Sequence, residues 1–149
     1  MEAHKYHVDL EWTMDRKGEI SSPTLNQKLE VATPPEFPKG MPGIWSPEHL
    51  FTAAISSCFM TTFLAIAENF NLEFTSLTCP AEGILDKKDG KYAMTEIILK
   101  PVLTIPNVDD REKAEKVMIK AEKACLISNS ITSVTHLKTT VLITEDQPA

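Results

Sequence analysis

The segment SPEHLFTAAISSCF at 46–59 decides the fold, because it predicts one long helix that the other elements must cover. Ser46 can cap this helix, proline is tolerated at the first helical position, and Glu48 complements the positive end of the helix dipole. From 50 to 67 nearly every residue is apolar or small, which is typical of a helix buried on all sides. We therefore expect a central helix that carries Cys58 in its interior.

Short strands are predicted before this helix. The segments 6–13, 19–22 and 27–33 have strand character, and the third alternates apolar and charged residues, with a turn at 14–18. The following segment, 34–47, contains five prolines and two glycines and is therefore a loop. A small antiparallel sheet should precede the helix.

A hairpin of two long strands is predicted after the helix. Residues 72–85 and 92–105 are rich in β-branched, aromatic and large aliphatic side chains, and Asp89-Gly90 between them favours a hairpin turn. Pro101 lacks a backbone donor, so the second strand should have an edge or a bulge there.

A second helix is predicted to begin at Asp109 and to end near Cys125. Its apolar and small residues follow helical spacing and place Cys125 on the inward face. Residues 134–144 read as a final strand and 145–149 as a frayed tail. The predicted class is α+β, in a single domain over 1–149, since a domain typically has ~100–200 residues.

Composition argues against several partners. The 15 basic and 21 acidic residues give a net charge of -6, which disfavours nucleic acid. Three cysteines cannot form a closed disulfide set, and the first dozen residues lack the apolar region of a signal peptide. The uncharged run 49–67 contains histidine, serine and threonine, so a soluble buried helix is favoured over a membrane span. A cytoplasmic protein without nucleic-acid or membrane partners is expected.

Two of the cysteines suggest peroxide chemistry. A thiolate attacks a peroxide and becomes a sulfenic acid, and a second thiol converts this acid to a disulfide before over-oxidation. Cys58 and Cys125 could form such a pair, and a buried Cys58 would need a cation to offset the rise in pKa that apolar surroundings cause. Arg16 could hold a thiolate and the Glu48 carboxylate together.

Each of these residues also has a plain structural interpretation. A buried cysteine is usually a small hydrophobe, which also describes Cys79. Arg16 in a turn is ordinarily solvated, and Glu48 is explained by the helix dipole alone. A metal site is disfavoured, because there is no Cys-x-x-Cys, and His4 and His7 would point to opposite faces of a strand. Neither a Gly-x-Ser-x-Gly nucleophile nor a phosphate-binding glycine loop occurs.

Several motifs together resemble one known family. SPEHLF at 46–51 and AAISSCF at 53–59 resemble the signature helix of the OsmC/Ohr superfamily of osmotically induced and organic-hydroperoxide-resistance proteins. CLISNS at 125–130 resembles its second cysteine motif, and LKPVLTI at 99–105 resembles the strand before its second helix. The likeness therefore spans nearly the whole chain.

The resemblance implies an intertwined homodimer in which antiparallel sheets enclose central helices, with two active sites at the subunit interface. It implies that Cys58 is the peroxidatic thiolate and Cys125 the resolving thiol, with Arg16 and Glu48 activating Cys58 and orienting the peroxide. The chain departs from the pattern at Leu126, where many members have proline, and around Arg16, where the glycine-rich context is missing.

The expected function is a thiol-dependent peroxidase that reduces organic hydroperoxides to alcohols. Apolar side chains of the 34–47 loop, with Phe51, could line a pocket for such substrates. The chemistry needs no metal, flavin or haem, and the resemblance implies an external dithiol or lipoyl-bearing protein as reductant. Two alternatives are a non-catalytic member that binds a small apolar ligand or an electrophile at the same cleft, and a structural dimer with inert cysteines.

Overall fold

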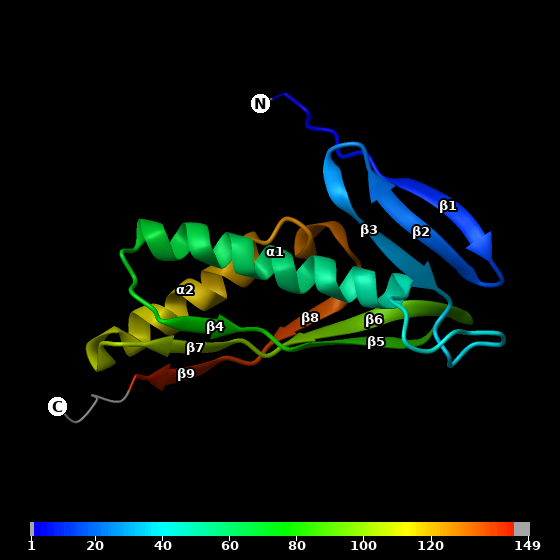
Figure 1. The fold of residues 1–149 in the computed structure, drawn as a ribbon. Helices are drawn as coiled ribbons and strands as arrows, with labels where there is room; N and C mark the ends of the chain where they lie inside the picture. The colour runs from blue at the N-terminus through cyan, green and yellow to red at the C-terminus, as the bar shows by residue number, and fades with distance from the viewer. Residues whose placement is uncertain (1, 145–149) are drawn as a thin grey trace. The chain divides into compact units, whose positions relative to one another are not determined.

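The computed structural model describes residues 2–144 (Figure 1). The chain divides into two compact units, Met1–Leu50 and Phe51–Ala149. Helix α1 (Pro47–Asn69) begins in the first unit and continues in the second. The predicted tail at 145–149 lies outside the described residues.

The first unit holds an antiparallel sheet in the order β1-β2-β3, as the sequence predicts. Its strands are β1 (Asp9–Met14), β2 (Lys17–Ser22) and β3 (Leu25–Ala32). Asp15 in the first turn has a left-handed backbone, with φ of 48°. The proline-rich loop after β3 is tied back to the sheet, because the backbone N–H of Ala32 donates to the carbonyl of Trp45 at 2.8 Å.

Ser46 caps α1 as predicted. Its hydroxyl oxygen accepts a hydrogen bond from the backbone N–H of His49 at 3.1 Å and lies 2.7 Å from Nδ1 of the same residue. The side chain of Ser46 is completely buried. The cap satisfies one of the backbone donors that a helix start leaves without an intrahelical partner.

Within a single chain, α1 is not buried on all sides, contrary to the prediction. The buried residues fall on one face at helical spacing: Ile55, Cys58, Phe59, Phe63 and Ala67. On another face, Met60 and Leu64 are each 42% exposed. Uniform apolarity indicates how much surface a helix can bury, but it does not indicate which face is covered. By length and composition α1 could also cross a membrane, a test that core helices of soluble proteins pass as well.

The predicted hairpin forms in the second unit between β5 (Ala81–Lys88) and β6 (Lys91–Leu99). Asp89 and Gly90 have φ of 53° and 78°, so both turn residues are left-handed. This backbone matches the right-handed twist of the flanking strands, which is why Asp-Gly is favoured in two-residue hairpins.

The remaining strands of the second unit make its sheets mixed, which corrects the expectation of antiparallel sheets. They are β4 (Ser76–Thr78), β7 (Val102–Ile105), β8 (Val134–Leu137) and β9 (Thr140–Ile143). β4 pairs antiparallel with β7, whereas β8 runs parallel to β6 and β9 runs parallel to β7. The parallel pairs arise because α2 (Arg111–Ala124) carries the chain back across the sheet before it re-enters in the same direction.

Pro101 divides the strand predicted at 92–105 into β6 and β7. The predicted strand at 134–144 divides at the same level, into β8 and β9. Pairing continues across the break, because the N–H of Lys138 donates to Leu99 at 2.8 Å and the N–H of Thr140 donates to Pro101 at 3.0 Å. Two paired strands are therefore interrupted at the same level, where proline removes a ladder donor.

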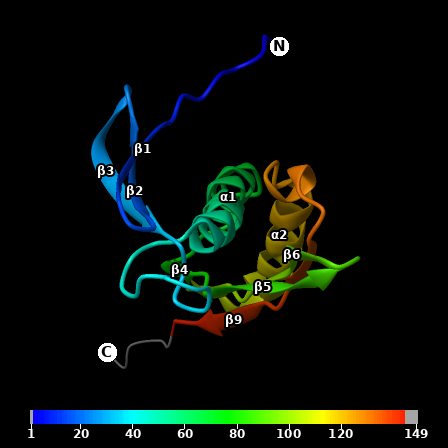
Figure 2. The same cartoon turned by 90° about the vertical axis from the view of Figure 1, so that its right-hand side faces the viewer.

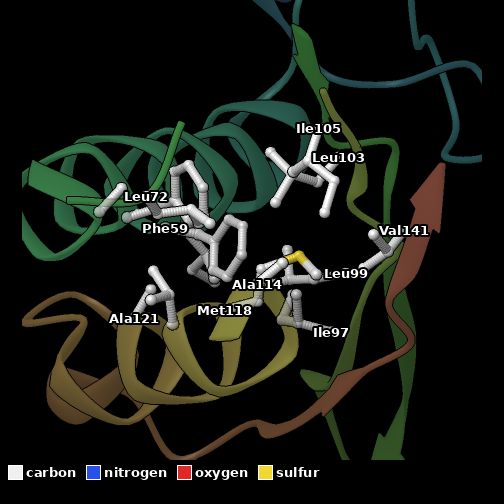
Figure 3. Close-up of a cluster of buried hydrophobic side chains, with 14 residues drawn as sticks. Phe59, Leu72, Ile97, Leu99, Leu103, Ile105, Ala114, Met118, Ala121 and Val141 are labelled. Carbon is white, nitrogen blue, oxygen red and sulfur yellow. The ribbon is translucent and has the colours of Figure 1, made fainter. Parts of the chain in front are cut away.

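Helices α1 and α2 lie on the same side of these strands in both views (Figures 1 and 2). Between the helices and the strands lies one buried cluster, part of which Figure 3 shows. It includes Phe59 from α1, Met118 and Ala121 from α2, and Ile97 and Leu103 from the strands, all fully buried. This core fixes how the middle of α1 meets the end of α2.

We expect Gly83→Ala to destabilise the second unit, because a Cβ at Gly83 would overlap the Thr52 hydroxyl and approach the Met94 methyl group to 2.7 Å. Such overpacking typically costs about 1–3 kcal/mol of unfolding free energy, or roughly 2–4 °C of Tm per kcal/mol at this size. Thermal unfolding followed by circular dichroism measures the change. Lys88→Ala on the same strand is the matched control, and an equal Tm for the two variants would contradict the close packing.

Candidate active site

The structure brings Cys58 and Cys125 into hydrogen-bond contact, although 66 residues lie between them in the chain. Cys58 lies in the middle of α1, and Cys125 directly follows the last residue of α2. Both are free thiols. Cys58 is 9% exposed and Cys125 is fully buried, so Cys58 is the more accessible residue of the two.

The chain around Cys125 is held in place by its own backbone. Cys125 leaves the helix in an extended conformation, with φ of -63° and ψ of 112°. Its carbonyl accepts from the N–H of Asn129 at 3.0 Å, and the carbonyl of Ile127 accepts from the N–H of Ser130 at 2.9 Å. The Ser130 hydroxyl also donates to the carbonyl of Leu126 at 2.8 Å. These bonds define a compact turn over 126–130 that lies against the sulfur pair.

Hydrogen bonding favours the thiolate of Cys58. Burial raises its pKa, but hydrogen bonds from the Cys125 thiol and the N–H of Ile127 lower it. Hydrogen bonds from the Thr62 hydroxyl and the N–H of Leu126 lower the pKa of Cys58 further, so the net pKa falls below the ordinary value. Each of these donors is uncharged and belongs to the second unit. The thiolate therefore has a stabilising environment that does not depend on a salt bridge.

The pKa of Cys125 is shifted in the opposite direction, above its ordinary value. Burial raises its pKa, and its hydrogen bond to Cys58 raises the pKa further. The Ser128 hydroxyl and backbone N–H offset only part of this rise in the pKa of Cys125. The hydroxyl of Ser128 is buried and has no hydrogen bond of ordinary geometry, so this contact with sulfur is a weak one. The pKa of Cys58 is thus lowered and that of Cys125 raised, so that Cys58 is the more readily ionised of the two.

Arg16 and Glu48 belong to the first unit, whereas the cysteine pair belongs to the second. Arg16 lies in the turn between β1 and β2, and its carbonyl accepts from the N–H of Thr33 at 3.2 Å. It lines a cavity of about 460 Å³ together with Trp12 and Pro47. Glu48 lies half-buried in the first turn of α1. The structure therefore places these two predicted residues at the sheet and the helix start of one unit.

Sequence reasoning missed the groups that contact the Cys58 sulfur from other positions. Thr62 lies four residues after Cys58, on the same helical face, and this spacing was visible in the sequence. The N–H groups of Leu126 and Ile127 carry no side-chain signal, because every non-proline residue has one. Their role depends on where the turn lies, which only the fold reveals.

The third cysteine and the metal-binding residue types do not add to the site. Cys79 packs against the core, and burial raises its pKa, as expected for an unreactive thiol. Within residues 2–144, no group of three or more histidine, cysteine, aspartate or glutamate side chains could hold a metal ion. The chemistry available here is therefore that of the two sulfurs.

Known proteins share this sequence pattern. The uncharacterized protein YmaD of Bacillus subtilis (strain 168) is 28% identical over 139 residues, covering 88% of this chain and 89% of that protein. Peroxiredoxin OsmC of Escherichia coli (strain K12) is 30% identical over 83 residues, covering 56% of this chain and 57% of that protein.

The fold is also shared with solved structures. An OsmC-like protein of unknown function from Vibrio cholerae superposes with a TM-score of 0.84 at 24% identity, covering 92% of this chain and 99% of that one. A family model described as OsmC-like protein matches residues 40–140, which include both cysteines of the pair. The resemblance seen in the sequence motifs is thereby confirmed, and this chain belongs to the OsmC-like protein family.

Proposed function

We propose that this protein is a thiol-dependent peroxidase that reduces organic hydroperoxides to alcohols through Cys58 and Cys125. The observation that carries the proposal is the contact between a thiol of lowered pKa and a second thiol of raised pKa. The name of the Escherichia coli relative, a peroxiredoxin, supports the same reaction class. Two free sulfurs in contact are what such a cycle requires.

The first step transfers one oxygen atom. The Cys58 thiolate attacks the outer peroxide oxygen, the O–O bond breaks, and the alkoxide leaves and takes a proton to become the alcohol. Cys58 is thereby oxidised to a sulfenic acid and the hydroperoxide is reduced by two electrons. The lowered pKa of Cys58 raises the thiolate fraction at neutral pH and so favours this step.

The second step protects the oxidised sulfur. The Cys125 sulfur attacks the sulfur of the Cys58 sulfenic acid, an S–S bond forms, and water leaves with the proton of the Cys125 thiol. The contact between the two side chains means that this step needs only a short movement of the turn at 126–130. An external dithiol, such as a lipoyl group, then exchanges with the disulfide and restores both thiols.

The surroundings of the sulfur pair favour an organic hydroperoxide. On α1, Cys58 lies next to the completely buried Phe59 and three residues after the completely buried Ile55. A substrate with a hydrocarbon part can replace water at such a site more readily than hydrogen peroxide can.

Arg16 and Glu48 enter this proposal as residues that assist Cys58. A guanidinium is permanently charged and can bind a carboxylate and a thiolate at once. Within the family resemblance, these two residues activate the thiolate and orient the peroxide. Arg16 would then lower the pKa of Cys58 beyond the effect of the uncharged donors.

We also propose that the protein is a cytoplasmic homodimer. The outer face of β1 presents Leu10 and Trp12, which are 71% and 73% exposed. Along α1, Met60 and Leu64 leave another apolar face exposed. Large exposed apolar side chains in each unit are typical of an interface, and a second copy would bury them in the manner that the resemblance implies.

Replacing each cysteine separates the two roles. We expect Cys58→Ser to abolish dithiol-dependent consumption of cumene hydroperoxide, because no thiolate remains to attack. We expect Cys125→Ser to react once, stop turning over, and accumulate Cys58 sulfinic acid. Peptide mass spectrometry of the peroxide-treated wild type should show Cys58 joined to Cys125, with Cys79→Ser as the active control. Unchanged turnover in Cys58→Ser would contradict the proposal.

The reaction should follow the ionisation of Cys58. Its pKa is lowered in the fold, so the oxidation rate should be lost only as pH falls through a midpoint below about 8.5, the ordinary value. We expect Arg16→Ala to move this midpoint upward by about one unit, because a nearby cation favours the thiolate. Stopped-flow oxidation over a pH series measures both, and an unchanged midpoint in Arg16→Ala would remove Arg16 from the site.

The dimer can be tested through the exposed face of β1. We expect Leu10→Glu to convert the dimer to a monomer, because burying an unpaired carboxylate against a second copy is costly. Glu11→Gln points to the opposite face of the strand and should leave the dimer intact. Sedimentation velocity distinguishes the species, and a wild-type protein that sediments as a monomer would refute this interface.

A further inference from the structure

The hydroxyl of Thr62 contacts a side-chain sulfur rather than the backbone of its own helix. A threonine within a helix commonly donates to the carbonyl of residue i−4, which here is the carbonyl of Cys58. Instead, Thr62 Oγ1 lies 3.8 Å from the Sγ atom of Cys58, within hydrogen-bond range for sulfur. The Cys58 carbonyl accepts from the hydroxyl of Thr61 at 3.1 Å. Thr61 therefore bonds to the carbonyl of Cys58, whereas the half-buried Thr62 contacts its sulfur.

The end of α2 supplies two further donors. Because Cys125 is extended, the N–H groups of Leu126 and Ile127 lie beyond the helical hydrogen-bond pattern, and hydrogen bonding by both lowers the pKa of Cys58. The side chain of Leu126 is 66% exposed, so this residue contributes to the site through its backbone. Successive backbone N–H groups in a turn form a concave site for an anion.

We propose that the Thr62 hydroxyl and the backbone N–H groups of Leu126 and Ile127 form an uncharged thiolate-binding site that activates Cys58. This inference rests on the proposed function only in taking Cys58 as the nucleophile. The three donors come from α1 and from the turn after α2, and both segments pack against the same buried core, through Phe59 and Ile127 respectively. Activation by these donors does not require Arg16.

The chain allows a specific test of each donor. Thr62→Val removes the hydroxyl at nearly constant shape, Thr62→Ser keeps it, and Thr61→Val is a control on the neighbouring residue. Leu126→Pro removes one N–H, whereas Leu126→Ala keeps it. A residue before proline favours an extended backbone. Cys125 already has such a backbone, with φ of -63° and ψ of 112°, so its conformation accommodates proline at position 126.

The measurement is the alkylation rate of Cys58 by iodoacetamide as a function of pH, read at the Cys58 peptide in the full-length protein. We expect the midpoint to rise by roughly 0.5–1 pH unit in Thr62→Val and in Leu126→Pro, the size expected for loss of one hydrogen bond. It should stay at the wild-type value in Thr62→Ser, Thr61→Val and Leu126→Ala. Oxidation by cumene hydroperoxide at neutral pH should fall about 3–10-fold in the same two variants.

Equal midpoints in Thr62→Val and Thr61→Val would overturn the role of the hydroxyl, and equal midpoints in Leu126→Pro and Leu126→Ala would overturn that of the backbone. If Leu126→Pro does not fold, as judged by circular dichroism, the threonine series still decides the proposal. Alkylation does not require turnover. Shifted midpoints in a protein that consumes no peroxide would therefore support the thiolate-binding site and contradict the proposed function.

Discussion

The contact between the Cys58 and Cys125 sulfurs depends on the packing of α1 against α2, and the rest of the site depends on that contact. Ala114 and Ala121 of α2 are fully buried in the cluster that includes Phe59 and Phe63 of α1. Small residues on one helix let the large rings of the other approach closely. The middle of one helix is thereby fixed beside the end of the other.

Placement on the two helices also explains why the sulfurs differ. Cys125 follows the last residue of α2, where the helix dipole is negative and disfavours a thiolate. Cys58 lies mid-helix, away from either helix end, and receives donors from the facing turn. Position thus gives two chemically identical side chains pKa values that are shifted in opposite directions. No charged residue of the second unit is needed for this asymmetry within the part of the chain that the structure describes.

Local signals in the sequence were sufficient for much of this architecture. Ser46 predicted the helix start, Asp89-Gly90 predicted the hairpin turn, and helical spacing predicted that Cys125 faces inward. Each of these features depends on neighbours within a few residues, so the chain itself carries the information. Pro101 likewise predicted an interruption, although the break extends to the paired strand as well.

The features that sequence reasoning missed depend on distant partners. The parallel pairing of β6 with β8 and of β7 with β9 is set by the crossover through α2, and strand composition does not encode it. The exposed face of α1 could not be identified, because its apolar residues occur on every side. The donors around Cys58 are mainly backbone groups, and which of them meet a sulfur depends on tertiary structure.

The position of Cys125, directly after the last residue of α2, bears on how a disulfide could form. A disulfide bond is about 2.05 Å long, so two sulfurs in hydrogen-bond contact must approach further before they join. The backbone of Cys58 is fixed by the hydrogen bonds of α1, so any backbone movement falls to the Cys125 side. Cys125 lies at the helix boundary, where a few residues of irregular backbone can be displaced while α2 stays intact. In the proposed cycle, the site would alternate between two covalent states while the hydrophobic core keeps one packing arrangement.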